Sequence, residues 1–476
     1  MTVGGLATLL ASGRNVILLP FLTRGLTIED YGVWVQAVAL VELLGSTSVI
    51  ALSSALARFA SVATERAAAA RGFWTSMVTS VVIGSCLALV MTSQSRWISR
   101  ILFHTEDYQL LVLTAAALIP LTACERLLLS FFHARLQVVR HALCLLVESV
   151  LYVGLAIWMV QRGGQAAGIL GVLMAARTTV LVGGSVLAAK DIGAASPDFA
   201  VLRQYLRFGM PLIGVSLFAW VTGLSDRYVI NWFHGPALVG AYSVAYTLGM
   251  LTAMLFSPLF SVLTPTLVPM WEQGDTYGVF RHLYHIIRYS IAGILPFVVG
   301  VTMLAEPIMR VVATEQYVTS RATVGFVAAG ILFLMLSGVL EPVVALIRKT
   351  ATSAVVYGVV AVTNLAVNFA LVPDLGALGA AVGTCIAFFV QLCAFYIYLR
   401  RHGVAVSLDL LLIAKCLISC TAMVWMLERI EVLGILDLLL AGVSGGAIYI
   451  AGLICLRAFS REEMRNWRRL LQPGRD

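Results

Sequence analysis

The chain has 476 residues, of which 60% are hydrophobic and only 12% are charged. Soluble domains carry about 25% charged residues, so the composition excludes a soluble protein and indicates one that crosses a membrane many times. The formal net charge of +8 does not indicate nucleic-acid binding, because the arginines are not gathered into one basic block with interleaved aromatic residues.

Apolar runs of about 18–25 residues recur along the chain, and short polar breaks separate them. At about 1.5 Å of rise per residue, a helix of that length crosses a hydrocarbon core of about 30 Å. Residues 72–95 and 375–399 are two such runs without a charged side chain. The sequence therefore predicts an all-α polytopic membrane protein with about fourteen transmembrane helices. They are centred near residues 15, 45, 83, 120, 151, 178, 221, 253, 294, 334, 363, 387, 417 and 446.

The positive charges are divided unequally between the loops on the two sides of these spans. One side takes about 20 lysines and arginines and the other about 7, which is the asymmetry between cytoplasmic and external loops. Both termini are therefore predicted to be cytoplasmic. Residues 1–16 lack a basic region before the apolar stretch, so we expect a retained span and no cleaved signal peptide.

Several enzyme classes are excluded by what the sequence lacks. No loop between the predicted spans exceeds about 20 residues, so no extramembrane domain is expected. A polymerase or ligase of lipid-linked sugars would need such a loop, with an arginine or histidine cluster. There is no G-x-x-x-x-G-K-[ST] stretch for a P-loop. The eight cysteines contain no C-x-x-C pair and predict no metal site.

The two halves of the chain contain stretches that resemble each other. Residues 25–40 and 233–248 can be aligned so that Gly32 matches Gly240, and both stretches follow one span and open the next. Such a duplication is common in transporters, where two related halves surround a binding site. The alternative is that two amphiphilic membrane segments look alike by chance.

Prolines and glycines affect the expected packing of the helices. The three prolines between residues 258 and 269 interrupt one predicted span, where they either permit bending or end the helix early. The pairs Gly379-x-x-x-Gly383 and Gly442-x-x-x-Gly446 predict close contacts between helices.

Five stretches are similar to one known family. They are LLPFLTRGLTIEDYGVW (Leu18–Trp34), SALARFAS (Ser54–Ser61), LRFGMPLIG (Leu206–Gly214), LSDRYVINWFHGPALVGAYSVAY (Leu224–Tyr246) and LFSPLFSVLTPTL (Leu255–Leu267). These stretches resemble bacterial polysaccharide flippases, the Wzx-like branch of the multidrug/oligosaccharidyl-lipid/polysaccharide exporter superfamily.

The resemblance implies a domain organisation around a central cavity that opens alternately to the two sides. We expect a first six-helix lobe (1–190), a cytoplasmic linker (191–207), a second six-helix lobe (208–399), and two further spans with a basic cytoplasmic tail (400–476). The tail is expected to lie against anionic lipid. In related proteins the last two spans form a lateral groove for a lipid tail.

The resemblance also implies a cargo and its partners. The cargo would be an oligosaccharide on a polyprenyl pyrophosphate, moved from the cytoplasmic to the periplasmic leaflet of the bacterial inner membrane for assembly of O-antigen, capsule or exopolysaccharide. A polysaccharide polymerase, a chain-length regulator and membrane lipid are expected partners of a functional monomer. No cofactor is expected beyond a coupling proton or sodium ion. The alternatives are a cation-coupled multidrug exporter of the same superfamily and a membrane polymerase or ligase of sugar lipids.

Charged residues inside the predicted spans are the candidate functional residues. Each isolated charge at depth costs roughly 2.5–3.5 kcal/mol on insertion scales, so these groups should face the bundle interior or water. They are Arg14, Glu42, Glu125, Arg126, Glu148, Arg177, Asp226, Arg227, Glu341 and Lys415.

Two functional hypotheses apply to these charges. Cavity arginines would bind the pyrophosphate, because a guanidinium fits phosphate oxygens bidentately and keeps its charge. The candidates are Arg14, Arg126, Arg177 and Arg227, with Arg24 and Arg58 near the span ends as additional ones. A buried carboxylate would instead carry a coupling ion. Glu42, Glu148 and Glu341 are favoured for that role, because none has a basic neighbour in the sequence.

Structural pairing is the third explanation of these charges. Asp226–Arg227 and Glu125–Arg126 are adjacent residues of opposite charge. Neighbours on a helix project about 100° apart, so each residue is expected to pair with another helix or to extend towards the interface. Asp226 and Arg227 are expected to anchor the seventh span near the cavity, with Arg227 the better contact for the cargo.

Overall fold

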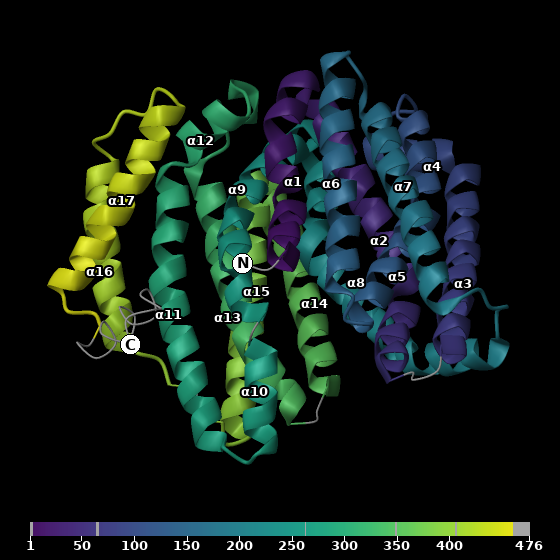
Figure 1. Ribbon diagram of the computed structural model, residues 1–476. Coiled ribbons are helices and arrows are strands. Elements are labelled where there is room, and N and C mark those ends of the chain that lie inside the picture. The colour runs from purple at the N-terminus through teal and green to yellow at the C-terminus, as the bar shows by residue number, and fades with distance from the viewer. Residues whose placement is uncertain (1–2, 63–65, 262, 348–349, 405–406, 460–476) are drawn as a thin grey trace. The chain divides into compact units, whose positions relative to one another are not determined.

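The computed structural model describes residues 3–62, 66–261, 263–347, 350–404 and 407–459. Within these ranges the regular structure is helical (Figure 1). The helices are α1 (Val3–Gly25), α2 (Ile28–Val62), α3 (Arg66–Ser93), α4 (Ser95–Phe103), α5 (Gln109–Ala134), α6 (Val138–Gln161), α7 (Ala166–Ile192), α8 (Phe199–His234), α9 (Pro236–Ser261), α10 (Leu263–Glu272), α11 (Thr276–Met303), α12 (Ala305–Val312), the 3₁₀ helix η1 (Glu315–Tyr317), α13 (Arg321–Leu346), α14 (Thr350–Leu375), α15 (Ala377–Arg401), α16 (Leu410–Leu427) and α17 (Ile435–Cys455).

The lengths of these helices confirm the predicted fold class. Among the described residues, 12 helices are long and apolar enough to cross a membrane, or 13 if the two parts of α8, bent by 48°, form one span. Each of the fourteen predicted span centres falls within an α-helix, the first of them within α1. The chain is a multi-pass membrane protein. The basic tail predicted to lie against lipid falls mostly in residues 460–476, outside the described ranges.

The chain divides into two compact units. Unit 1 comprises Met1–Thr247, Val312–Tyr317 and Ala351–Ala387, and unit 2 comprises the remainder. The division passes through α9 and α15, whereas the predicted lobes were divided near residues 190 and 208. Those lobe boundaries remain a prediction.

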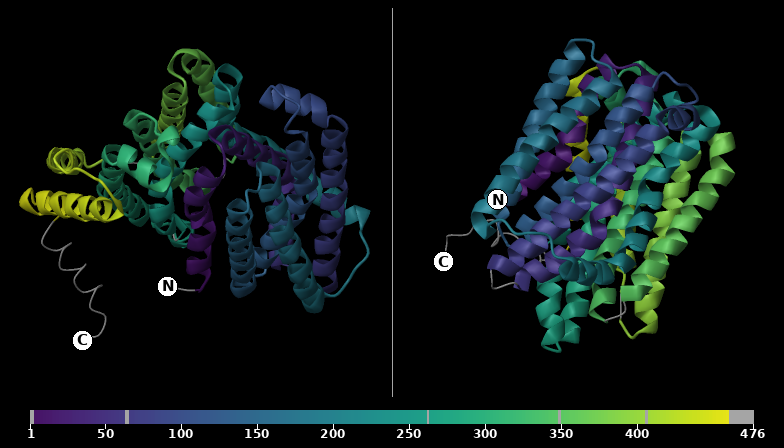
Figure 2. Two further views of the ribbon diagram at one scale, coloured as in Figure 1. Left: turned by 90° about the horizontal axis from the view of Figure 1, so that it is seen from above. Right: turned by 90° about the vertical axis from the view of Figure 1, so that its right-hand side faces the viewer.

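In unit 1, α2 and α5 form the most extensive helix pair. Helix α2 also packs on α3 and α8, and α7 packs on both α5 and α6 (Figures 1 and 2). A cluster of buried aromatic and aliphatic side chains joins α2, α3 and α5, with Phe73, Phe131 and Phe132 fully buried in it. This packing fixes the helices that carry most of the charged residues described below.

In unit 2, α11 packs on α13 and α16, and α16 packs on α17 (Figure 1). Polar contacts near one end of α16 join it to α11. Asp409 pairs with Arg288 at 3.2 Å and accepts a hydrogen bond from Tyr284 at 3.1 Å. Lys415 donates to the carbonyl oxygen of Arg457 at 2.9 Å. This contact links α16 to the segment that follows α17.

The matched glycines of the two halves touch each other in unit 1. A methyl group added at Gly32 would lie 1.9 Å from the carbonyl oxygen of Pro236 and 3.0 Å from the backbone nitrogen of Gly240. One added at Gly240 would lie 2.5 Å from the carbonyl oxygen of Ile28. When a two-fold axis relates two halves of a chain, equivalent residues of the halves contact each other if they lie on that axis. The contact between Gly32 and Gly240 therefore supports the duplication.

The proline and glycine expectations have different outcomes. Two helices, α9 and α10, occupy the place of the proline-interrupted span. Gly379 and Gly383 do permit close contact between α15 and α14. A methyl group added at Gly379 would lie 2.5 Å from an atom of α14, and one added at Gly383 would lie 2.2 Å from another. The close helix contact expected at Gly442 and Gly446 is wrong, because no atom lies within 4 Å of a Cβ added at either glycine.

Candidate functional site

A polar cavity of about 520 Å³ lies inside unit 1. Four of the six arginines predicted to bind the pyrophosphate line it, Arg24 and Arg58 do not, and Glu42 is the carboxylate in its wall. The charged lining residues are Arg14 on α1, Glu42 on α2, Arg126 on α5, Arg177 on α7 and Arg227 on α8. Aromatic residues of the same unit, including Trp34 and Trp220, complete the wall. Five helices thus bring charges that are distant in sequence to one void.

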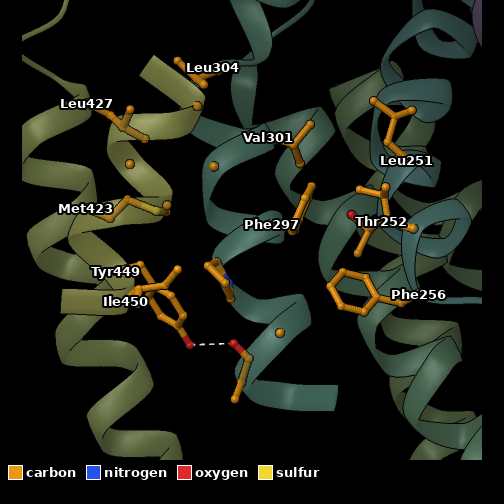
Figure 3. A pocket seen from close by; sticks show the side chains of 18 of the residues that line it. Leu251, Thr252, Phe256, Phe297, Val301, Leu304, Met423, Leu427, Tyr449 and Ile450 are labelled. Atoms are coloured by element: carbon orange, nitrogen blue, oxygen red, sulfur yellow. Dashed lines mark hydrogen bonds between the residues drawn. The ribbon is translucent and has the colours of Figure 1, made fainter. Parts of the chain in front are cut away.

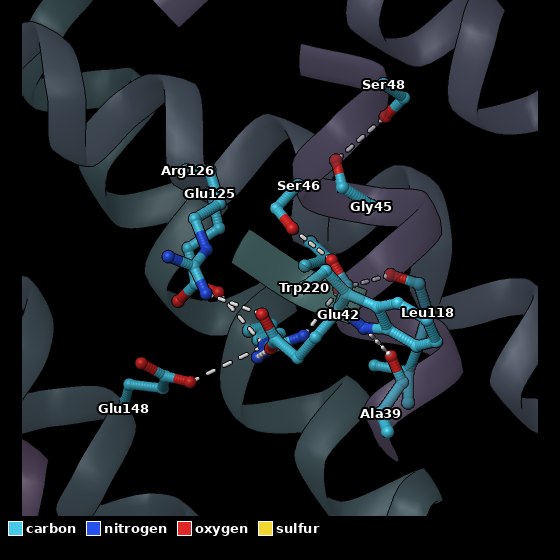
Figure 4. A network of polar contacts seen from close by, with 12 residues as sticks. Ala39, Glu42, Gly45, Ser46, Ser48, Leu118, Glu125, Arg126, Glu148 and Trp220 are labelled. Carbon is cyan, nitrogen blue, oxygen red and sulfur yellow. Dashed lines mark hydrogen bonds and ion pairs between the residues drawn. The ribbon is translucent and has the colours of Figure 1, made fainter. Parts of the chain in front are cut away.

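Arg177 pairs with three carboxylates, and Figure 4 shows these side chains, Glu42, Glu125 and Glu148, gathered in one network. Its Nη2 lies 2.9 Å from Oε1 of Glu42, and its Nε lies 3.0 Å from Glu125 and 3.5 Å from Glu148. Its Nη1 donates to the hydroxyl of Thr122 at 2.5 Å. Only 3% of Arg177 is exposed, so this guanidinium is a buried cation held by three carboxylates from three helices. Such pairing offsets the cost of burying each charge.

Arg14 and Arg126 flank this centre and are more accessible. Arg126 Nη2 lies 2.5 Å from Oε2 of Glu42, and its side chain is 54% exposed. Arg14 Nη1 lies 2.7 Å from Oε1 of Glu148, and its side chain is 21% exposed. Each therefore shares a carboxylate with Arg177 while keeping donors that face the cavity.

The expectation for the adjacent pairs is correct at one site and wrong at the other. Glu125 pairs with Arg177, and Arg126 pairs with Glu42, so both members of this pair find partners on other helices. Arg227, in contrast, pairs with its own neighbour Asp226 at 2.9 Å. A long arginine side chain can fold back along the helix and overcome the divergent directions of neighbouring Cβ atoms.

Asp226 and Arg227 contact side chains of α9, while their anchoring role remains a prediction. Tyr242 on α9 donates to Oδ2 of Asp226 at 2.5 Å, and the Arg227 guanidinium lies 4.5 Å from the ring centre of Tyr246. Asp226 is fully buried and Arg227 is 6% exposed. The Nε of Arg227 has no hydrogen-bond partner among the described residues, although Arg227 lines the cavity.

The coupling candidates Glu42 and Glu148 have basic partners in space that their sequence neighbours do not show. Glu42 and Glu148 were favoured because no basic residue is adjacent in sequence, yet each contacts two arginines. Their partners come from other helices, which sequence neighbours do not reveal. The coupling role itself remains a prediction.

Three other candidates lie away from the cavity wall. Arg24 is exposed near the end of α1, and Arg58 is exposed on α2 with its guanidinium 4.9 Å from the ring centre of Phe208. Glu341 is half-buried on α13 in unit 2. Among the described residues, no group of three or more His, Cys, Asp or Glu side chains is arranged to hold a metal ion.

Unit 2 contains a second, apolar and partly open cavity of about 820 Å³, which we call the apolar groove (Figure 3). It lies among α9, α11, α16 and α17, with Phe256, Phe297 and Met423 in its walls. Tyr449 also lines it, and its hydroxyl donates to the carbonyl oxygen of Ala292 at 2.7 Å. Gly442 and Gly446 line it too, and their missing side chains leave room in it.

Family models match most of the chain. One, described as "Polysaccharide biosynthesis protein", matches residues 21–322. A second, described as "Lipid II flippase MurJ", matches residues 233–444. An uncharacterized membrane protein of Methanocaldococcus jannaschii, MJ1068, is 23% identical over 271 residues. That match covers 56% of this chain and 53% of the relative, so the chain spans about half the length of the curated relative it matches.

Solved structures share the fold. A structure of the lipid II flippase MurJ in an inward closed conformation has a TM-score of 0.74 at 12% identity, covering 95% of this chain and 97% of that chain. An inward-facing multidrug resistance MATE family transporter has a TM-score of 0.64 at 16% identity, with coverages of 84% and 95%. A transporter from Pyrococcus furiosus has a TM-score of 0.54 at 16% identity, with coverages of 83% and 97%.

The fold and the family models agree with the resemblance seen in the sequence. At these low identities the structural neighbours establish the fold, while the first family model spans more than half of the chain. The chain is a multi-pass membrane protein that belongs to the polysaccharide biosynthesis protein family, and residues 233–444 are in addition similar to the lipid II flippase family.

Proposed function

We propose that this transporter moves a polyprenyl-pyrophosphate-linked oligosaccharide from the cytoplasmic to the periplasmic leaflet of a bacterial inner membrane by alternating access. The observation that carries the proposal is the gathering of four arginines around one cavity of unit 1. An anionic headgroup suits such a wall, because guanidinium groups hold phosphate oxygens by charged, often bidentate hydrogen bonds.

Arg14 and Arg126 are the proposed primary ligands of the diphosphate. Both side chains are partly exposed, and each holds its carboxylate through one nitrogen in the pairs described above. A charged hydrogen bond contributes about 1.5–3 kcal/mol, so losing one should weaken binding about tenfold or more.

Complementation of a gene deletion tests the function. The deletion strain should lose its surface polysaccharide and retain lipid-linked precursors inside. The double variant Arg14→Gln with Arg126→Gln should fail to restore the glycan although it accumulates normally. Arg100→Gln is the matched control, because Arg100 pairs with Glu106 at an exposed site.

Other results of this experiment would reject the proposal. Normal glycan together with lost drug resistance would identify a cation-coupled multidrug exporter instead. A glycan of altered chain length with normal translocation of precursor would point to a polymerase or ligase. If the double variant restores the glycan, Arg14 and Arg126 are not required for transport.

The apolar groove of unit 2 is proposed to hold an isoprenoid chain. Gly446→Trp should obstruct it without a backbone clash, since nothing lies within 4 Å of the added Cβ position. Displacing about three methylene groups at about 0.8 kcal/mol each should weaken binding of a long polyprenyl diphosphate about 30–100-fold. Gly434→Trp, at a similarly open position outside the groove lining, should bind normally in the same titration. Equal binding by both variants would show that the chain lies elsewhere.

The remaining expectations about the cell belong to the same proposal. Both termini would be cytoplasmic, which follows from the distribution of lysine and arginine among the loops. A polysaccharide polymerase and a chain-length regulator would act on the exported product. A proton or sodium ion would supply the coupling.

A further inference from the structure

The four cavity arginines differ in how many of their nitrogens are already engaged. Each of the three guanidinium nitrogens of Arg177 has a partner, namely two carboxylates at Nε, Thr122 at Nη1 and Glu42 at Nη2. Its side chain is 4% exposed, against 21% for Arg14 and 54% for Arg126. Arg177 is therefore poorly placed to receive a ligand, although the sequence suggested it for that role.

The carboxylates around Arg177 are shared in a particular way. Glu42 gives Oε1 to Arg177 and Oε2 to Arg126. Glu148 contacts Arg177 and Arg14 through Oε1. Each of the two accessible arginines, Arg14 and Arg126, is thus paired with a carboxylate that also contacts Arg177. Glu125 differs from these carboxylates, because its ion pair is with Arg177 and not with Arg14 or Arg126.

Binding of a diphosphate would separate these shared pairs. When Arg14 and Arg126 turn towards phosphate oxygens, Glu148 and Glu42 each lose one cationic partner. A buried carboxylate without a partner is strongly disfavoured. Arg177 remains in contact with both carboxylates, offsets part of their negative charge and holds them away from the ligand.

We propose that Arg177 is a positioning residue that retains Glu42 and Glu148 while Arg14 and Arg126 exchange them for the diphosphate. This inference rests on the proposed function. It assigns the arginines different tasks: two accessible side chains bind the ligand, and one buried side chain holds the displaced carboxylates. Without Arg177, the carboxylates would hold Arg14 and Arg126 more tightly and repel the incoming anion.

Binding of farnesyl diphosphate to the purified full chain tests the exchange by isothermal titration. Arg177→Gln should weaken binding about tenfold, within the range usual for coupling between sites. Adding Glu42→Gln and Glu148→Gln should return the affinity to within about threefold of the wild type, because neutral side chains release Arg14 and Arg126. Adding Glu125→Gln instead, which also removes one buried negative charge, should leave binding weak.

The two rescue variants separate positioning from other roles of Arg177. If neither rescue restores binding, Arg177 is itself a ligand and the inference is wrong. If Glu125→Gln restores it equally well, Arg177 serves only to balance buried charge, and the inference is also wrong. Arg177→Lys keeps the buried positive charge should the glutamine variant fail to fold. It should give a smaller loss with the same pattern of rescue.

Failure of the proposed function would look different. In that case the wild type would not bind farnesyl diphosphate, or the variant Arg14→Gln with Arg126→Gln would bind it as well as the wild type. When the wild type binds farnesyl diphosphate and this double variant does not, the proposed function stands, and the two rescue variants then test the role of Arg177.

Discussion

Asp226→Ala is expected to lower the free energy of unfolding by about 3–5 kcal/mol, because it leaves the Arg227 guanidinium buried without its carboxylate. Asp226 is fully buried and also accepts hydrogen bonds from the Arg227 backbone and the Tyr242 hydroxyl. The measurement is thermal unfolding of the purified protein in detergent. The replacement removes the polar link between α8 and α9 described above.

The matched control is Glu106→Ala, which breaks an exposed ion pair with Arg100. Exposed pairs contribute about 0–1 kcal/mol, so this variant should unfold close to the wild type. Equal stability of Asp226→Ala and Glu106→Ala would show that the buried pair does not anchor α8. A swapped variant, Asp226→Arg with Arg227→Asp, separates anchoring from ligand binding. Full transport by this variant would exclude phosphate binding by Arg227.

Gly32→Val is expected to prevent accumulation of folded protein. The new Cβ would lie 1.9 Å from the Pro236 carbonyl oxygen, and that atom belongs to the backbone and cannot rotate away. Overpacking typically costs about 1–3 kcal/mol where side chains can adjust, and a backbone clash should exceed that range. Gly240→Val should behave alike, because its Cβ would lie 2.5 Å from the Ile28 carbonyl oxygen.

Gly154→Val provides the control for this prediction. Gly154 is an exposed helical glycine, and nothing lies within 4 Å of its added Cβ position. The yield of monodisperse protein in gel filtration should be normal for this variant and strongly reduced for the other two. Normal yields for all three would mean that the α2–α9 crossing is looser than its geometry indicates.

The positions of the membrane helices could be predicted well from the sequence. Long apolar runs and the positions of charged breaks depend on local composition, so all fourteen predicted centres fall within helices. The sequence also selected Arg14, Arg126, Arg177 and Arg227, because charges at membrane depth must face a polar interior. That argument depends on the cost of burial and needs no knowledge of the neighbours.

The partners of these charges could not be predicted, because they depend on how helices pack. Glu42 and Glu148 had no basic neighbour in sequence, yet Arg177 reaches both from α7. Arg227 pairs with the adjacent Asp226 against the expected divergence of neighbouring side chains, since four flexible bonds allow its guanidinium to return.

The apolar groove illustrates a second limit. A glycine pair at four-residue spacing in a membrane helix has the same pattern whether another helix or an empty space faces it. Gly379 and Gly383 face α14, whereas Gly442 and Gly446 face the groove. Periodicity places both pairs on one side of a helix and does not determine what that side meets.

The charged cavity of unit 1 has a consequence for energetics across the bilayer. Its four arginines are matched by four carboxylates in direct ion pairs, of which Glu42 lies in the wall itself and the other three lie behind it, so this cluster carries no net charge when all eight groups are ionised. The transmembrane voltage would then act on the proposed diphosphate cargo and hardly on the empty protein. At about 2.3 kcal/mol per charge for 100 mV, a negative cytoplasm would favour outward passage of the anion, while return of the unloaded protein would be nearly independent of voltage.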